Sequence, residues 1–543
     1  MRSIFNPIIP GYYPDPSICR VGEDYYLVCS SFEFCPALPV FHSRDLANWE
    51  KICNAFSAEQ GLQVYAWSGV GGIMAPTIRY HNGTYYIINS NMNRGSNCNY
   101  IITAKDPAGP WSEPIYLPDV PNIDASMFFD DDGTCYLIGT GMVTKKPCGE
   151  EGRCIWACPF DTNKMKLIGS PVAIWDSALR GAASPESPHI YKKNGWYYLM
   201  IAEGGTEHYH SITIARSRDI MGWYEGNPAN PILTHRHLGY NYPIGNVGHG
   251  DLVETPDGRW YCVMLASRLI DGYHKNLGRE SFICPVEWER DWPVLCPGEG
   301  RLSESYPIPD EGWHPFPVRP VREDFDREML CPDWVFWGTP NQPFHRTEDS
   351  KLYLRCLPRP LDMPILPLRS DRTPEEIFHK NISGLFIRQT DLDVEVAAKM
   401  DFIPLGTESA GLAIVQAMNH SLRIERALNN GEQVVRVVLS ETAFNLPPFI
   451  PGYDGKTVTQ TLAQHFWENT DIIVSFRIHR QSCEVLCGSD ESSLQPLCTV
   501  DLKRINPPHV GGFAGTVFGL YATGNGNSSP NEASFDWFDY RPL

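Results

Sequence analysis

The sequence predicts an all-β protein, a five-bladed β-propeller followed by a β-sandwich of the lectin-like jelly-roll type. Three observations lead to this fold class. A hairpin motif recurs five times in about the first 310 residues, a proline-rich segment ends the repeat, and short alternating strands fill the rest. With 543 residues the chain exceeds the roughly 250–300 residues at which a single core stops growing, so two domains are expected.

The repeated motif is an extended stretch, a turn rich in Asp, Asn and Gly, and a strand that begins with aromatic residues. Its copies read DPSICRVGEDYYLVC, APTIRYHNGTYYII, DASMFFDDDGTCYLIG, ESPHIYKKNGWYYLM and GDLVETPDGRWYCVML. The landmark tyrosines Tyr26, Tyr86, Tyr136, Tyr198 and Tyr261 are 60, 50, 62 and 63 residues apart. Such spacing leaves room for about four short strands per copy, which is the content of a propeller blade.

Carboxyl side chains occupy the same position in three of the five copies. The residues twelve before the later four tyrosines are Met74, Asp124, Glu186 and His249, and Asp15 lies eleven before Tyr26. A single aspartate at such a place is usually a strand-end cap. Because equivalent positions of different blades converge on the propeller axis, three acids in register instead predict a functional site.

A second domain is expected after the proline-rich segment ESYPIPDEGWHPFPVRPVREDF, which has the composition of a linker. The predicted domains are residues 1–318, the propeller, and residues 319–543, the sandwich. Stretches such as KLYLRCL, DVEVAAKMDF and DIIVSFRIH alternate as the strands of a sandwich do.

Composition excludes several classes of partner. The net charge of −19 argues against nucleic acid, and no apolar run of about 18 residues predicts a membrane span. The N-terminal MRSIFNPIIPGYYPDPS lacks the continuous apolar segment of a secretory signal, and the cysteine count of 17 is odd. These features predict a cytoplasmic protein.

Several segments resemble glycoside hydrolase family 43, in particular its β-xylosidase branch with a C-terminal β-sandwich. They are NPIIPGYYPDPSICR, FHSRDLANWE, IDASMFFDDDG, ESPHIYKKNGWYYLMIAEGGT, ITIARSRDI, GHGDLVETPDGRWY and LGRESFICPVEW. The resemblance implies that Asp15 is the general base, that Asp124 orients the acid and tunes its pKa, and that Glu186 is the general acid.

The same resemblance implies the residues that bind the sugar. It assigns sugar contacts to Phe32, Thr206, His249 and Arg279, and closure of one side of the pocket to Phe513 or Phe518. Core positions in the sandwich are an equally good interpretation of these two phenylalanines. Met74 stands where many family members have Trp, so a softer side chain replaces a flat sugar-binding face.

The expected function is inverting release of xylose from the non-reducing ends of xylo-oligosaccharides. One alternative is an α-L-arabinofuranosidase, or an enzyme with both activities that also accepts arabinose-substituted oligosaccharides. Another is a carbohydrate-binding propeller that has lost catalysis. No cofactor is expected, although an axial calcium ion near His249, as in some relatives, is an alternative to a sugar contact. Association into a homo-oligomer is compatible with the sequence.

Overall fold

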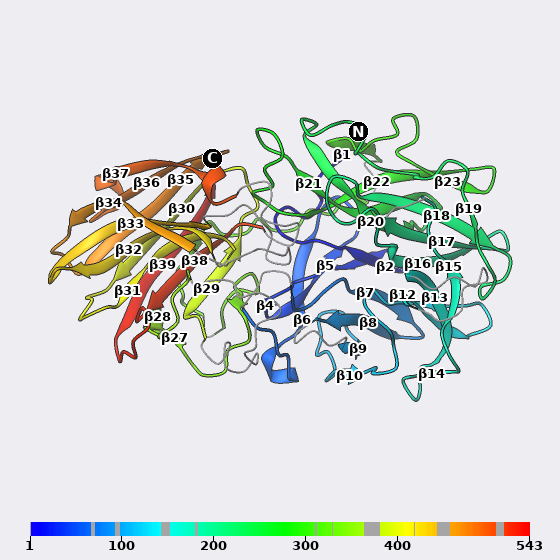
Figure 1. The fold of residues 1–543 in the computed structure, drawn as a ribbon, viewed down its shortest axis with the longest axis horizontal. Helices are drawn as coiled ribbons and strands as arrows, with labels where there is room; N and C mark the ends of the chain where they lie inside the picture. Colours follow the sequence, from blue (N-terminus) through cyan, green and yellow to red (C-terminus); the bar gives the residue numbers. More distant parts are fainter. Residues whose placement is uncertain are drawn as a thin grey trace.

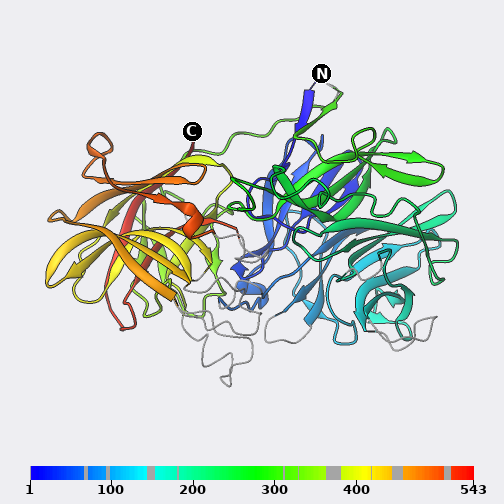
Figure 2. The same cartoon turned by 45° about the horizontal axis from the view of Figure 1, so that its top comes forward.

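The computed structural model describes most of the chain as two bodies lying side by side (Figures 1 and 2). The first runs from blue to green in the figures and the second from yellow to red. The described residues are 2–66, 71–92, 98–142, 153–179, 183–309, 312–327, 329–362, 381–417, 419–442, 457–506 and 515–543. No helix in these ranges is long and apolar enough to cross a membrane.

Five antiparallel sheets form the first body, each built from strands that follow one another in the chain, except that β4 (Phe34–Cys35) is left out of the first sheet. The innermost strands are β2 (Ser17–Val21), β7 (Thr77–His81), β11 (Ser126–Phe129), β16 (Glu186–Lys193) and β20 (Ile244–Glu254). The second strands are β3 (Asp24–Val28), β8 (Thr84–Asn91), β12 (Cys135–Met142), β17 (Trp196–Glu203) and β21 (Trp260–Arg268). Each of the five sequence repeats is therefore the inner hairpin of one blade.

The outer strands complete the blades. They are β5 (Ala37–Ser43), β6 (Glu50–Phe56), β9 (Cys98–Ala104), β10 (Ile115–Tyr116), β13 (Arg153–Asp161), β14 (Lys166–Leu167), β15 (Val172–Trp175), β18 (Ser211–Ser217), β19 (Glu225–Gly226), β22 (Glu280–Glu289) and β23 (Trp292–Leu295). Each innermost strand contacts the next one around a ring, and β20 contacts β2 again. This closed ring confirms the predicted five-bladed propeller.

A buried polar network joins the innermost strands across the axis. Asp251 on β20 accepts hydrogen bonds from Ser17 Oγ of β2 at 2.8 Å and from Tyr191 OH of β16 at 2.6 Å. Arg79 of β7 forms an ion pair with Asp251 at 2.9 Å and also approaches His189 Nδ1 at 2.9 Å. Although burial alone would raise it, Arg79 and these hydrogen bonds hold the pKa of Asp251 far below its usual range.

Residues from both ends of the first body close the ring. Strand β1 (Arg2–Phe5) pairs with β24 (Ser305–Ile308), and Ile9 forms a β-bridge with Ser281 of blade 5. The side chain of Asn6 donates to the Ile283 carbonyl at 2.8 Å and accepts from the Ile283 N–H at 2.9 Å. The N-terminal segment is thus an integral part of the propeller.

The second body is a sandwich of two antiparallel sheets. One sheet has the order β27 (His345–Glu348), β28 (Lys351–Arg355), β39 (Glu532–Pro542), β30 (Asp393–Asp401), β35 (Asp471–His479), β36 (Ser482–Gly488) and β37 (Gln495–Asp501), with β25 (Arg322–Glu323) also on β39. The other has the order β29 (Gly384–Arg388), β38 (Val517–Thr523), β31 (Ser409–Ala417), β32 (His420–Asn429), β33 (Glu432–Thr442) and β34 (Thr457–Phe466). The described 3₁₀ helices are η1 (Ala58–Gln60), η3 (Glu491–Ser493) and η4 (Leu502–Arg504). The sheets enclose a core of alternating apolar residues, as predicted.

The two bodies share strand pairing and a hydrophobic cluster. Strand β26 (Phe336–Trp337) pairs with β4 (Phe34–Cys35) of the propeller. Trp337 Nε1 donates to Glu33 Oε2 at 3.0 Å. An interdomain cluster, which combines propeller and sandwich side chains, comprises Tyr12, Phe32, Phe34, Ala66, Val335, Trp337, Leu361, Ile382, Phe386, Ala413, Val415, Val517 and Tyr521. The linker expected near residues 318 and 319 lies between β24 and β25.

Candidate active site

The register positions lie at one end of the propeller channel. Asp15, Met74 and Asp124 precede their innermost strands, Glu186 begins β16, and His249 lies within β20. The backbone φ angles of Asp15, Asp124 and His249 are 56°, 57° and 52°. Residues other than glycine rarely adopt this left-handed region. Such backbone strain is often found at functional sites.

Asp15 is held as a carboxylate. Its Oδ1 accepts a hydrogen bond from Arg279 Nη1 at 2.8 Å, and its Oδ2 accepts one from Ser30 Oγ at 2.5 Å. His249 Nδ1 lies 3.7 Å from the same Oδ1. Burial alone would raise the pKa of Asp15, but Arg279, His249 and Ser30 together lower it. An ionised carboxylate is the form required of a general base.

Asp124 and Glu186 are shifted in the opposite direction. Burial raises the pKa of Asp124 well above its usual range, and the charges of Glu186 and Asp15 raise it further. Burial also raises the pKa of Glu186, with Asp15 adding to it and Arg153 opposing it. The two carboxyls therefore titrate together and hold protons at higher pH than Asp15 does.

Accessibility distinguishes the two carboxyls that hold protons. Asp124 is buried, whereas the side chain of Glu186 is 27% exposed. A group that gives a proton to a substrate must reach it, so Glu186 is the better placed donor. Arg153 Nη1 donates to Glu186 Oε1 at 2.8 Å.

The predicted sugar contacts gather around Asp15. Arg279 Nη1 also donates to Thr206 Oγ1 at 3.0 Å, and its guanidinium lies 5.3 Å from the Phe32 ring centroid. Phe32 of blade 1 forms a β-bridge with Ile73, the residue before Met74. The bridge therefore places Phe32 beside the start of blade 2. Met74 packs partly buried against the interdomain cluster. Together with His249, which lies 3.7 Å from Asp15, these four side chains surround the same end of the channel.

Of the two phenylalanines predicted to close the pocket, the structure describes only Phe518. Phe518 lies on β38, is fully buried in the sandwich core and packs on Tyr540 with 5.9 Å between ring centroids. Its side chain is a core residue and does not line the channel, because on β38 it faces the opposite sheet. Phe513 lies outside the described residues.

Two residues near the acids were not predicted from the sequence. Ser30, which follows the first inner hairpin, holds Asp15, and Arg153, at the start of β13, holds Glu186. Arg153 is 33 residues before Glu186 and belongs to another blade. No local pattern marks it, whereas Ser30 lies only two residues from Phe32.

The surroundings of His249 do not suit a calcium ion on Asp15. The carboxylate oxygen nearest to His249 already accepts a hydrogen bond from the Arg279 guanidinium, which is itself a cation. Calcium sites need several oxygen ligands. Among the described residues, no group of three or more His, Cys, Asp or Glu side chains is arranged to hold a metal.

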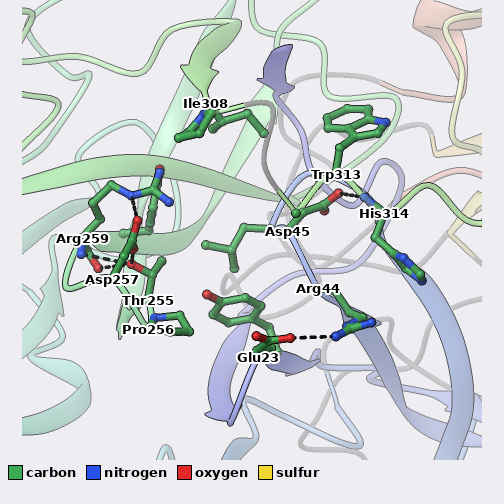
Figure 3. A pocket seen from close by; sticks show the side chains of 15 residues that line it. Glu23, Arg44, Asp45, Thr255, Pro256, Asp257, Arg259, Ile308, Trp313 and His314 are labelled. Carbon is green, nitrogen blue, oxygen red and sulfur yellow. Dashed lines mark hydrogen bonds and ion pairs between the residues drawn. The ribbon is translucent and has the colours of Figure 1, made fainter. Parts of the chain in front are cut away.

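A separate cleft of about 440 Å³ lies at the other end of blades 1 and 5, beside the turns that follow β2 and β20 (Figure 3). Its acidic side chains are already engaged. Arg44 pairs with Glu23 at 2.9 Å and Arg259 pairs with Asp257 at 2.8 Å. Because these carboxylates are held in ion pairs, the chemistry is assigned to the opposite end, where Asp15, Asp124 and Glu186 lie.

Family comparisons cover both bodies of the molecule. Residues 4–293 match the model described as glycosyl hydrolases family 43. Residues 322–541 match the model described as the beta xylosidase C-terminal Concanavalin A-like domain.

Individual relatives match over the full length of the chain. It is 39% identical to a xylosidase/arabinosidase of Butyrivibrio fibrisolvens, with 98% of each chain covered. It is 34% identical to a non-reducing end alpha-L-arabinofuranosidase of Bacteroides ovatus, with 100% of this chain and 95% of that protein covered. The crystal structure of a xylan beta-1,4-xylosidase from Bacillus halodurans superimposes with a TM-score of 0.87 at 30% identity, over 99% of this chain and 100% of that one. Because these similarities extend across the propeller and the sandwich, we conclude that the chain belongs to glycosyl hydrolase family 43.

Proposed function

We propose that the protein is an inverting, exo-acting β-1,4-xylosidase that releases xylose from the non-reducing ends of xylo-oligosaccharides. Asp15 is the general base, Glu186 the general acid, and Asp124 the neighbour that sets the pKa of the acid. The observation that carries this proposal is the opposite shift of carboxyl pKa values at one end of the channel, down for Asp15 and up for the pair.

The chemistry follows from these protonation states. Asp15 takes a proton from a water molecule whose oxygen attacks the anomeric carbon. The bond from that carbon to the leaving oxygen breaks, and Glu186 gives its proton to that oxygen. The water attacks from the face opposite the leaving group in the same step, so the anomeric configuration is inverted. This arrangement typically requires carboxyls about 6.5–9.5 Å apart.

Exo action is supported by the position of the second domain. Phe32 and Met74, from blades 1 and 2, pack in one cluster with Trp337 and Phe386 of the sandwich side. The sandwich therefore covers the channel mouth on the side of these two residues. A site covered on one side favours chain ends over the middle of a polymer.

An α-L-arabinofuranosidase activity is the second candidate. Met74 offers adaptable packing in place of a flat aromatic face. Two relatives that match the full chain carry arabinosidase or arabinofuranosidase in their names. The same acid, base and modulator would serve either glycone, so the candidates differ in the sugar pocket and not in the mechanism.

Further parts of the proposal concern the state of the protein. We infer that it acts without a resident metal ion, since Arg279 occupies the carboxylate oxygen that a cation near His249 would need. A cytoplasmic location and association into a homo-oligomer complete the proposal. Chelator treatment, cell fractionation and light scattering test these three points.

The decisive experiment compares wild type with Glu186→Ala on substrates that differ in their leaving group. The substrates are xylobiose, 4-nitrophenyl β-D-xylopyranoside, 2,4-dinitrophenyl β-D-xylopyranoside and 4-nitrophenyl α-L-arabinofuranoside. Loss of a general acid should reduce xylobiose turnover by about 10²- to 10⁴-fold. The dinitrophenyl substrate should lose far less, because its leaving oxygen needs no proton.

Proton NMR of the first sugar formed reports the mechanism. Release of α-xylose from the β-xyloside supports inversion, and release of β-xylose contradicts it. Turnover of the arabinoside alone would move the assignment to the furanosidase. No turnover of any substrate by the wild type would instead support a binding protein.

A further inference from the structure

A group of large exposed side chains lies next to the active site and has no role in the mechanism above. We define the aromatic rim as His208, Tyr209, Tyr240 and Tyr273. Tyr209 is 64% exposed and Tyr240 is 51% exposed, which is unusual for side chains of this size. Clustered exposed aromatic surface of this kind is typical of binding sites.

The aromatic rim is held in place by ring contacts and hydrogen bonds. His208 stacks on Tyr240 with 4.0 Å between ring centroids, and Tyr240 meets Tyr273 edge to face at 5.1 Å. Tyr273 OH donates to Glu207 Oε2 at 3.0 Å, and Lys275 Nζ donates to the same oxygen at 2.6 Å. These contacts order the rim before any ligand arrives, which reduces the entropy lost on binding.

The rim is continuous with the candidate active site. Glu207 directly follows Thr206, which accepts a hydrogen bond from Arg279, the partner of the base Asp15. The loop that joins β17 to β18 folds back tightly on itself. A Cβ on Gly204, at its start, would lie 2.2 Å from the carbonyl oxygen of Tyr209. This tight loop holds the backbone of Tyr209, which lies three residues after the predicted sugar contact Thr206 in the chain.

An exo-acting site takes one sugar into its pocket, so a surface beside the site can meet only the sugars on the leaving-group side of the scissile bond. His208 and Tyr209 belong to the loop between β17 and β18 of blade 4, the blade that carries Glu186. Tyr240 and Tyr273 belong to the loops around β20 and β21 of blade 5. Phe32 and Met74 come from blades 1 and 2, across the axis. The rim thus includes the blade that carries the acid, whose proton goes to the leaving oxygen.

We propose that the aromatic rim binds the sugar units on the leaving-group side of the scissile bond, so that the enzyme prefers oligosaccharides longer than the disaccharide. This inference rests on the proposed function. The ligand class is a neutral pentose oligosaccharide, whose ring faces are apolar and stack on aromatic side chains, while Tyr hydroxyls and Glu207 meet its hydroxyl groups.

The test uses the full chain with Tyr209→Ala and Tyr240→Ala. The value of kcat/KM is measured for xylotetraose and for 4-nitrophenyl β-D-xylopyranoside, which has no sugar beyond the broken bond. Each variant should lose about three- to tenfold on xylotetraose and stay near wild type on the aryl substrate. Tyr240→Phe retains the ring and should retain most of the activity on xylotetraose.

Tyr116→Ala is the matched control, since Tyr116 is 54% exposed on β10, the outermost strand of blade 2. It should leave both substrates unaffected. Equal losses on both substrates, or no loss on xylotetraose for Tyr209→Ala and Tyr240→Ala, would overturn the inference. Failure of the proposed function looks different, because wild type would then release no pentose from either substrate.

Discussion

Burial alone would raise the pKa of all three carboxyls at the channel end, and their neighbours set them apart. Arg279, His249 and Ser30 surround Asp15, whereas Asp124 faces the charge of Glu186 and both of these carboxyls face that of Asp15. The positions of these acids were predicted from the register of the repeats. The family resemblance also predicted a raised pKa for Glu186. The contribution of Arg153 was not predicted, because this residue belongs to another blade and no local pattern identifies it.

Asp124→Asn removes the carboxyl that faces Glu186. Because the two carboxyls titrate together, the last proton of the pair is held by the negative charge of the first carboxyl to ionise; with Asn at position 124 that charge is absent, and Glu186 loses its proton at lower pH. We expect the alkaline limb of the kcat/KM profile to move to lower pH and turnover at neutral pH to fall about 10²-fold or more. An alkaline limb that stays at its wild-type position would contradict the role of Asp124.

Arg153→Gln should shift the pKa of Glu186 in the opposite direction, upwards. The Arg153 guanidinium stabilises the charged form of Glu186, so its removal raises the pKa of this carboxyl. The alkaline limb should therefore move to higher pH. Arg153→Lys keeps the positive charge and serves as the control, with its limb nearer to that of the wild type. A shift to lower pH would show that Arg153 does not act on the acid.

At the scale of elements, the inner hairpins were the most predictable part of the molecule. All five repeats became the inner two strands of blades because their turn residues and alternating aromatics specify a hairpin locally. The role of the phenylalanines in the segment GGFAGTVFG was less predictable. An apolar residue such as Phe518 suits a core and a pocket equally well by sequence, and the sheet pairing of β38 decides for the core.

Because Asp251 connects three other innermost strands, the stability of the propeller should depend on its charge. Asp251→Asn leaves the Arg79 charge without its buried partner, and we expect a loss of about 3–5 kcal/mol in the free energy of unfolding at pH 7. Urea denaturation provides the measurement. Glu254→Gln, on the exposed end of the same strand, is the control and should change stability little.

The pH dependence of that difference has a definite sign. The folded pKa of Asp251 is lowered, so its contribution is complete above the unfolded value of about 3.9 and disappears as the pH falls toward the folded pKa. The gap in stability between wild type and Asp251→Asn should therefore narrow below about pH 4. A gap that stays constant on acidification would exclude the charge as its cause.

At the scale of the whole molecule, the two domains behave as one structure. The strand pair β4–β26 and the interdomain cluster connect them, and Phe32 of the candidate site belongs to that cluster. The sequence predicted the two domains and the linker between them. It did not predict the strand pair, because two-residue strands carry no recognisable pattern and pair only once both domains are in place.

Trp337→Ala tests this connection. Trp337 is buried between the domains and donates to Glu33, the neighbour of Phe32. We expect a loss of about 3–5 kcal/mol in stability, a lower Tm and reduced turnover. Trp223→Ala is the control, since Trp223 is 43% exposed on the propeller surface. Full activity of Trp337→Ala at temperatures where it is folded would show that the interface does not support the site.

The closure of the propeller by β1 and β24 has a consequence for the order of events during synthesis. Residues 2–5 leave the ribosome long before their partners, residues 305–308. The inner hairpins can form one after another as the chain emerges, because their contacts are local. This closure has to wait until residue 308 has been translated, and until then strand β1 has an unpaired edge.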